Sequence, residues 1–213
     1  MTEEKFQLMC KYENEYAAQG ITTIGGIDEA GRGPLAGPVV AGCIFWNSTG
    51  PFVKADDSKK LSEAKRELLY DEIINNALAW GVGIVDNNII DEINILNATQ
   101  LAMKNACENA VKMLKKDNLD QEGIIFIDHV KLNDMPCSTL SITHGDALSV
   151  SIAAASIIAK VTRDRMMVEY DKQYPGYGFA GHKGYGTKKH YEAIRQFGIS
   201  TIHRKTFLKN FVM

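Results

Sequence analysis

Residues 24–34, which read IGGIDEAGRGP, decide how the rest of this chain is interpreted. The apolar first half predicts a buried strand over residues 23–28. The glycines and prolines that follow predict a turn into a second apolar strand over residues 39–46. Two adjacent carboxylates, Asp28 and Glu29, stand where the first strand ends. The stretch is therefore either a tight turn between two strands or one side of a ligand site.

Strand and helix patterns alternate along the remaining chain. Apolar spacing and caps predict helices over residues 3–19, 62–77, 97–116, 149–169 and 188–197, and strands over residues 80–86, 123–128 and 140–143. Such alternation indicates an α/β layered fold with a mixed or parallel sheet. After Tyr174 a segment with five glycines leads into a helix and a short basic tail helix. We therefore predict a sheet domain over residues 1–174, including the N-terminal helix, and a small helical attachment over residues 175–213.

The charge of the chain is unevenly distributed. The 213 residues include 24 Lys and Arg and 26 Asp and Glu, for a formal net charge of −2. Residues 1–159 carry −9, whereas residues 160–213 carry +7. A basic C-terminal face is suited to a polyanion such as nucleic acid, and a solvated helical surface is the other interpretation of the same charges.

Several classes of protein are excluded by composition. The longest uncharged, mostly apolar run, residues 147–159, is too short to span a bilayer, and the first five residues lack the apolar core of a signal peptide. Four widely spaced cysteines indicate reduced thiols in a soluble, cytoplasmic protein. The five histidines lack zinc-binding spacing. Residues 181–188 contain the residues of a phosphate-binding loop in the wrong order, and no apolar strand precedes them, so binding of a nucleoside triphosphate is not expected. No small-molecule organic cofactor is predicted. A monomer is the default state.

Four acidic residues are candidates for chemistry. They are Asp28, Glu29, Asp128 and Asp146. Carboxylates at the ends of neighbouring strands converge at one edge of an α/β sheet, and crowded carboxylates repel unless a divalent cation is bound. Oxygen ligands suit Mg²⁺ or Mn²⁺, which act on phosphates. The alternative is that each residue merely ends a strand or caps a turn.

Five ordered blocks of this sequence resemble the ribonuclease HII family, and together they cover most of the chain. They are GGIDEAGRGPLAGP at 25–38, DSKKLS at 57–62, ID at 127–128, GD at 145–146 with SIAAASIIAKVTRD at 151–164, and HKGYGT at 182–187. The resemblance implies a ribonuclease H-like fold, with a mixed central sheet flanked by helices and a small C-terminal helical attachment. It also implies a metal-dependent endoribonuclease.

The resemblance implies a reaction and its catalytic residues. Asp28, Glu29, Asp128 and Asp146 would hold two divalent cations, Mg²⁺ or Mn²⁺, around the scissile phosphate in a two-metal mechanism. The implied substrates are the RNA strand of RNA–DNA hybrids and ribonucleotides embedded in duplex DNA. Cleavage on the 5′ side of the ribonucleotide would leave 5′-phosphate and 3′-hydroxyl ends.

The resemblance also assigns residues to substrate binding. The Gly-Arg-Gly turn would sense the ribose 2′-hydroxyl, a tyrosine would stack on the sugar at the RNA–DNA junction, and a serine and two lysines would contact flanking phosphates. These residues are Gly31, Arg32, Gly33, Tyr185, Ser58, Lys59 and Lys183. Without the resemblance, a structural role for Tyr185, holding its loop against the preceding helix, would be preferred.

Two departures and two rival functions complete the prediction. His129 follows Asp128 where the family commonly has a small residue, which puts the local loop shape in doubt. The chain also lacks the long N-terminal extension of the related ribonuclease HIII, and Asp146 replaces the Glu of that sister family.

The two rival functions are a non-catalytic nucleic-acid-binding module and a metal nuclease that ignores the sugar, in which the Gly-Arg-Gly segment is a mere turn.

Overall fold

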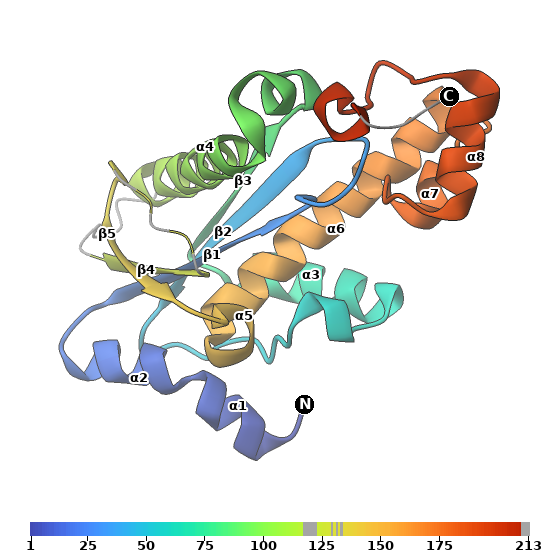
Figure 1. Cartoon of the computed structure of the whole chain (residues 1–213). Helices are drawn as coiled ribbons and strands as arrows, with labels where there is room; N and C mark the ends of the chain where they lie inside the picture. The colour runs from blue at the N-terminus through green and yellow to red at the C-terminus, as the bar shows by residue number, and fades with distance from the viewer. Residues whose placement is uncertain (117–122, 129, 131, 133, 210–213) are drawn as a thin grey trace.

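The centre of the protein is a five-stranded mixed sheet (Figure 1). The computed structural model describes residues 1–116, 123–128, 130, 132 and 134–209. The strands are β1 (Thr23–Ala30), β2 (Val39–Asn47), β3 (Ala79–Val85), β4 (Gly123–Asp128) and β5 (Ser138–Ile142), in the spatial order β3-β2-β1-β4-β5. β1 and β3 each pair antiparallel with β2, whereas β1, β4 and β5 run parallel. The predicted α/β class with a mixed sheet is confirmed.

Helices connect and cover these strands. The α-helices are α1 (Glu3–Met9), α2 (Lys11–Ala18), α3 (Glu63–Asn76), α4 (Asn87–Lys116), α5 (Gly145–Leu148), α6 (Val150–Gln173), α7 (Phe179–His182) and α8 (Lys188–Phe197). Two short 3₁₀ helices are η1 (Ser58–Lys60) and η2 (Lys205–Leu208). None of the described helices is both long and apolar enough to cross a membrane.

The two longest helices, α4 and α6, pack on opposite faces of the sheet (Figure 1). Cys43 and Phe45 of β2 belong to the apolar cluster with α4, and the alternate residues Ile44 and Trp46 belong to the cluster with α6. This follows from the twofold alternation of side chains along a strand. Ala153, Ala154 and Ala155 of α6 are fully buried in this second cluster.

Two helix predictions need correction. The opening helix is interrupted at Cys10, so that residues 3–19 form two helices instead of one. The long helix begins at Asn87, ten residues before the predicted start, and bends at Asn94, whose φ of 67° is left-handed. The Asn94 side chain accepts hydrogen bonds from the N–H groups of Leu96 and Asn97, which caps the second part of the helix. The predicted start at residue 97 therefore falls just inside the second part of the helix.

The C-terminal segment packs against the rest of the chain through its own apolar cluster. Phe179, Ile194 and Ile202 are buried there together with Ala36 and Met167, which precede residue 175. A short β-bridge also joins Ala36 to His203. The proposed division of the chain at residue 174 remains a prediction.

Candidate active site

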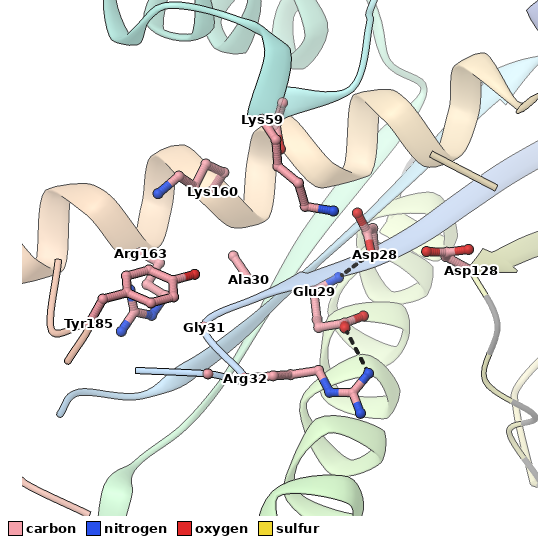
Figure 2. Close-up of a pocket in the computed structure, with 12 residues that line it drawn as sticks. Asp28, Glu29, Ala30, Gly31, Arg32, Lys59, Asp128, Lys160, Arg163 and Tyr185 are labelled. Carbon is pink, nitrogen blue, oxygen red and sulfur yellow. Dashed lines mark hydrogen bonds and ion pairs between the residues drawn. The ribbon is translucent and has the colours of Figure 1, made fainter. Parts of the chain in front are cut away.

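Three of the four candidate carboxylates lie at one edge of the sheet. Parallel β1 and β4 are neighbours in register, with Ile27 opposite Ile127. The next residues, Asp28 and Asp128, therefore lie side by side at the ends of the paired segments (Figure 2). Glu29 lines the same pocket. The order of the strands thus brings together carboxylates that are a hundred positions apart in the sequence.

Asp28 is the most deeply buried of the four carboxylates, with 6% of its surface exposed. Burial raises its pKa well above the usual range, and the negative charges of Glu29 and Asp128 raise it further. The N–H of Glu29 donates to Asp28 Oδ1 at 2.8 Å, and the ammonium of Lys59 also favours the ionised form. These two interactions lower the pKa of Asp28 by less than burial raises it. A bound cation would therefore stabilise the Asp28 carboxylate.

Asp146 reaches the same region from a helix. The N–H of Gly145, the first residue of α5, donates to Asp128 Oδ1 at 2.8 Å. This bond holds the start of α5 against the end of β4. Asp146 Oδ2 then lies 3.2 Å from Lys59 Nζ. Among the described residues, the pocket lining includes the other three carboxylates but not Asp146.

The donors at this edge suit a hard divalent cation. All four are carboxylates, and oxygen ligands are those that Mg²⁺ and Mn²⁺ prefer. As they stand, no three His, Cys, Asp or Glu side chains in the described part of the chain form a metal-binding cluster. The Lys59 ammonium supplies positive charge at the site instead. The raised pKa of Asp28 and the crowding of like charges indicate that the residues fit such an ion.

Residues 31–38 are here called the glycine loop, and its first three residues, Gly31, Arg32 and Gly33, line the other side of the pocket. Gly31 has a φ of +96°, and a Cβ built there would lie 2.1 Å from Arg163 Nε, so both the backbone and the packing require glycine. Arg32 pairs with Glu29 through Nη1 and Oε1 at 3.4 Å (Figure 2). A Cβ on Gly33 would lie 3.6 Å from the ring of Tyr185. The loop and the half-exposed tyrosine therefore adjoin each other in the pocket.

The remaining residues assigned to substrate binding are divided between the pocket and its surroundings. Ser58 and Lys59 line the pocket from η1, where Asp57 caps the helix by accepting the N–H of Lys59 at 2.9 Å. Lys183 does not appear among the described lining residues, and its ammonium donates to the carbonyl of Ala180 at 2.6 Å. His129 lies outside the described residues.

Three buried charged residues, two of which contact the glycine loop, have no role predicted from the sequence. Arg163 lies in a block that resembles the family and lines the pocket, but its sequence context indicates no partner. Arg204 is fully buried and contacts the glycine loop. Glu13 of α2 is also fully buried, and it accepts from Ser149 Oγ at 2.5 Å and from the N–H of Ser151 at 3.0 Å. All three depend on contacts far apart in sequence, which composition and spacing do not reveal.

The fold and this acidic sheet edge define a class of protein, the ribonuclease H-like α/β enzymes. A family model described as ribonuclease HII matches residues 25–210. Over 208 residues the chain is 52% identical to ribonuclease HII of Clostridioides difficile (strain 630), covering 98% of this chain and 78% of that relative. The chain belongs to the ribonuclease HII family and is a hydrolase with endonuclease activity.

Two further comparisons agree with this placement. The chain is 55% identical over 205 residues to ribonuclease HII of Acetivibrio thermocellus, covering 96% of this chain and 77% of the relative. The crystal structure of the ribonuclease H2 from Pyrococcus horikoshii OT3 is similar with a TM-score of 0.65 at 28% identity, covering 86% of this chain and 93% of that one. The family and the ribonuclease H-like fold expected from the five sequence blocks are confirmed.

Proposed function

We propose that this protein hydrolyses the RNA strand of RNA–DNA hybrids and cuts duplex DNA on the 5′ side of embedded ribonucleotides, leaving 5′-phosphate and 3′-hydroxyl ends. The proposal rests on one observation, which is that Asp28, Glu29 and Asp128 share a pocket with the glycine loop. Carboxylates suit the hydrolysis of a phosphodiester, and closely approachable backbone suits the recognition of a sugar. A pocket that combines the two can couple cleavage to the presence of a ribose.

Asp28, Glu29, Asp128 and Asp146 are the residues that would hold two divalent cations, Mg²⁺ or Mn²⁺. When bound, such ions would lower the pKa of the attacking water and stabilise the leaving 3′-oxygen. The protein's part is to hold the carboxylates in place. Asp28 is fixed by burial in β1, and Asp128 is fixed by the N–H of Gly145.

Lys59 and Arg32 provide positive charge beside the carboxylates. The side chain of Lys59 is 77% exposed, so its ion pair with Asp146 is weak and exchanges readily for another anion. A substrate phosphate that enters the pocket would find this ammonium within reach. Arg32 pairs with Glu29 through a single nitrogen, which leaves the rest of its guanidinium group for a second contact. Both residues would set the position of the substrate without reading its bases.

The 2′-hydroxyl would be recognised by the backbone of residues 31–33, and Tyr185 would stack on the sugar at the RNA–DNA junction. The 2′-hydroxyl is the group that distinguishes RNA from DNA at a given position. Tyr185 lies close enough to Gly33 for one nucleotide to contact both. The ring is 46% exposed, so one face of it is accessible to a ligand.

One cleavage assay tests this proposal. The protein is incubated in Mg²⁺ or Mn²⁺ with duplex DNA that carries one ribonucleotide, with an RNA–DNA hybrid, and with all-DNA and all-RNA duplexes. We expect cuts in the first two only, and a 5′-phosphate on the product. Absence of cleavage at the ribonucleotide contradicts the proposal.

The same assay separates the two rival functions. A non-catalytic binding module would retain the duplexes without cutting any of them, and a nuclease that ignores the sugar would cut the all-DNA duplex equally well. The variant Asp28→Asn should lose activity by at least about a hundredfold while keeping the fold, because it removes a charge at the reacting phosphate. Asp71→Asn, an exposed change on α3, is the control and should retain full activity.

A monomeric state and a cytoplasmic location are part of the same proposal. All four cysteines carry free thiols, which agrees with a reducing compartment. Light scattering of the purified protein, with and without a hybrid duplex, tests the monomeric state.

A further inference from the structure

We propose that Arg204 is a positioning residue for ribonucleotide recognition: it holds the carbonyl groups of the glycine loop so that the N–H groups of Arg32 and Gly33 are presented to the pocket. This inference deepens the proposed function and rests on it. It assigns part of the sugar specificity to a residue outside the pocket lining, in a segment more than 160 positions from the loop.

The contacts of Arg204 are directed at the backbone of one loop. Its Nη2 donates to the carbonyl oxygens of Gly31 at 2.6 Å and Pro38 at 3.1 Å. Nη1 donates to the carbonyl of Arg32 at 2.9 Å, and Nε donates to that of Gly37 at 3.0 Å. One guanidinium group thus binds both ends of the glycine loop, with the planar fork geometry that arginine has and lysine lacks.

A second buried arginine completes the arrangement. Arg163 Nε donates to the carbonyl of Pro38 at 3.0 Å, and its Nη2 donates to that of Ala36 at 3.1 Å. Its Nη1 donates to the carbonyl of Lys183 at 2.9 Å, two residues before Tyr185. Arg163 therefore joins the glycine loop to the segment that carries the tyrosine, whereas the hydrogen bonds found for the Arg204 side chain among the described residues all go to the glycine loop.

Both guanidinium groups are buried without a carboxylate partner. Arg163 is 1% exposed and Arg204 is 0% exposed, and in the described part of the chain neither forms an ion pair. Burial lowers the pKa of Arg163 to about 10 and that of Arg204 to about 9, so both are charged at neutral pH. Burying two positive charges is costly, and here hydrogen bonds to carbonyl groups, together with the Phe207 ring 5.1 Å from the Arg204 guanidinium, offset part of the cost. An apolar side chain would fill the same space at lower cost, which points to a role for the hydrogen bonds.

That role follows from the direction of the peptide groups. Carbonyls of residues 31 and 32 accept hydrogen bonds from the interior, on the side of Arg204. Within the described residues, the N–H groups of Gly31, Arg32 and Gly33 form no hydrogen bond to a backbone carbonyl of a turn or loop. The same three residues line the pocket. The carbonyl of Gly31 shares its peptide group with the N–H of Arg32, and the carbonyl of Arg32 shares its peptide group with the N–H of Gly33. Fixing these two carbonyls on one side leaves the N–H groups of Arg32 and Gly33 as donors on the other side, where a 2′-hydroxyl oxygen can accept.

The test compares sugar-dependent with sugar-independent binding. For the wild type, Arg204→Met and Arg204→Lys, we measure kcat and KM on duplex DNA with one ribonucleotide, and the Ki of the all-DNA duplex as competitor. For Arg204→Met we expect KM to rise about tenfold, the effect of about one hydrogen bond, while Ki changes less than twofold. Arg204→Lys keeps the positive charge but loses the planar guanidinium group with its several donors. Its ratio of Ki to KM should lie between those of the wild type and Arg204→Met.

Controls separate positioning from folding. Arg165→Met, which changes an exposed arginine of α6 that pairs with Glu67, should keep the wild-type ratio. Circular dichroism melts identify variants that fold, and if Arg204→Met does not fold, Arg204→Lys decides. The inference is overturned if the folded variants keep the wild-type ratio, including the case in which KM and Ki rise together. If the wild type itself does not cut at the ribonucleotide, the proposed function fails first, and this inference fails with it.

Discussion

Asp28 lies in surroundings that are unfavourable to its own charge. It is buried between Glu29 and Asp128, and its pKa is raised by burial and by both neighbours. A structural aspartate is ordinarily placed where hydrogen bonds or cations lower its pKa. The opposite arrangement is typical of sites that bind an ion or transfer a proton, and it distinguishes this residue from the strand-ending aspartates considered as an alternative.

Tyr185 has two possible roles, stacking on the sugar of the substrate or holding its own loop in place, and a single substitution distinguishes them. We predict that Tyr185→Ala lowers kcat/KM at an RNA–DNA junction about tenfold, because stacking on an aromatic ring is worth about 1–3 kcal/mol per base. Tyr185→Phe keeps the ring and should be close to wild type. Steady-state cleavage kinetics measure both variants. An unchanged rate for Tyr185→Ala would reduce the ring to a packing residue.

Glu13 is expected to make stability depend on pH. Burial raises its pKa in the folded protein above the ordinary value of 4.5. Between those two pKa values the folded state binds more protons than the unfolded state, so Glu13 lowers the free energy of unfolding as pH rises through this window. The variant Glu13→Gln keeps an acceptor for Ser149 and Ser151 but has no charge. We predict that its stability relative to the wild type increases from pH 4.5 to pH 8.

Urea unfolding at several pH values measures this difference. Glu15→Gln is the matched control, because residue 15 is exposed on the same helix. Its difference from the wild type should be the same at every pH. A pH-independent difference for Glu13→Gln would show that the buried carboxyl is not protonated on folding.

At the scale of elements, the distance between α6 and the sheet is set by a glycine in β2. A Cβ built on Gly42 would lie 2.5 Å from the carbonyl oxygen of Ala155, a backbone atom that cannot turn away. We predict that Gly42→Ala destabilises the protein by about 1–3 kcal/mol through overpacking. Thermal and urea unfolding measure the change. Gly181→Ala, where a Cβ meets no atom within 4 Å, is the control and should cost less; equal effects would contradict this account of the packing.

Elements with strong local signals were predictable from the sequence. β4 was predicted with the bounds that the structure has, because the run at 124–127 is wholly apolar and ends on Asp128. α3 begins after Ser62 as predicted, and the Ser62 hydroxyl accepts the N–H of Lys65. The break at Cys10 was not predictable, since neither glycine nor proline marks it. Tertiary packing of the two short helices decides it instead.

The positions of the candidate carboxylates were predictable to a similar extent, and their roles remain a prediction. Each carboxylate follows an apolar strand or opens a helix, so its position was visible, and the sequence blocks joined all four into one site. Arg204 was not predictable, because its partners are carbonyl groups, which every residue has. A hydrogen bond to the backbone leaves no trace in the identity of the partner residue.

At the scale of the whole molecule, the distribution of charge says more about attraction to nucleic acid than the net charge does. The net charge of −2 indicates no attraction to a polyanion. Arg32, Lys59 and Lys160 nevertheless line the pocket, and residues 160–213 carry a net +7. Local cations of this kind bind phosphates with release of counterions, whatever the total charge of the protein.

We therefore predict that binding to a hybrid duplex is strongly salt-dependent. For about four phosphate contacts, raising monovalent salt from about 50 to about 200 mM should weaken binding about a hundredfold. Fluorescence anisotropy with a labelled hybrid, at constant divalent cation, measures the slope of log Kd against log salt. An affinity that does not change with salt would contradict binding through the basic residues.

The contact between Arg204 and Gly31 also has a consequence for the order of folding events. The two residues are 173 positions apart, and closing a chain segment of that length costs on the order of 4–5 kcal/mol of entropy. The antiparallel pairing of β1 with β2, by contrast, joins residues that are close in sequence. Contacts between residues far apart in sequence form after contacts between nearby residues have reduced the number of conformations open to the chain. A refolding chain should thus regain its helices and sheet before it regains the ability to distinguish ribose from deoxyribose, and for a brief interval it would be folded but indifferent to the sugar.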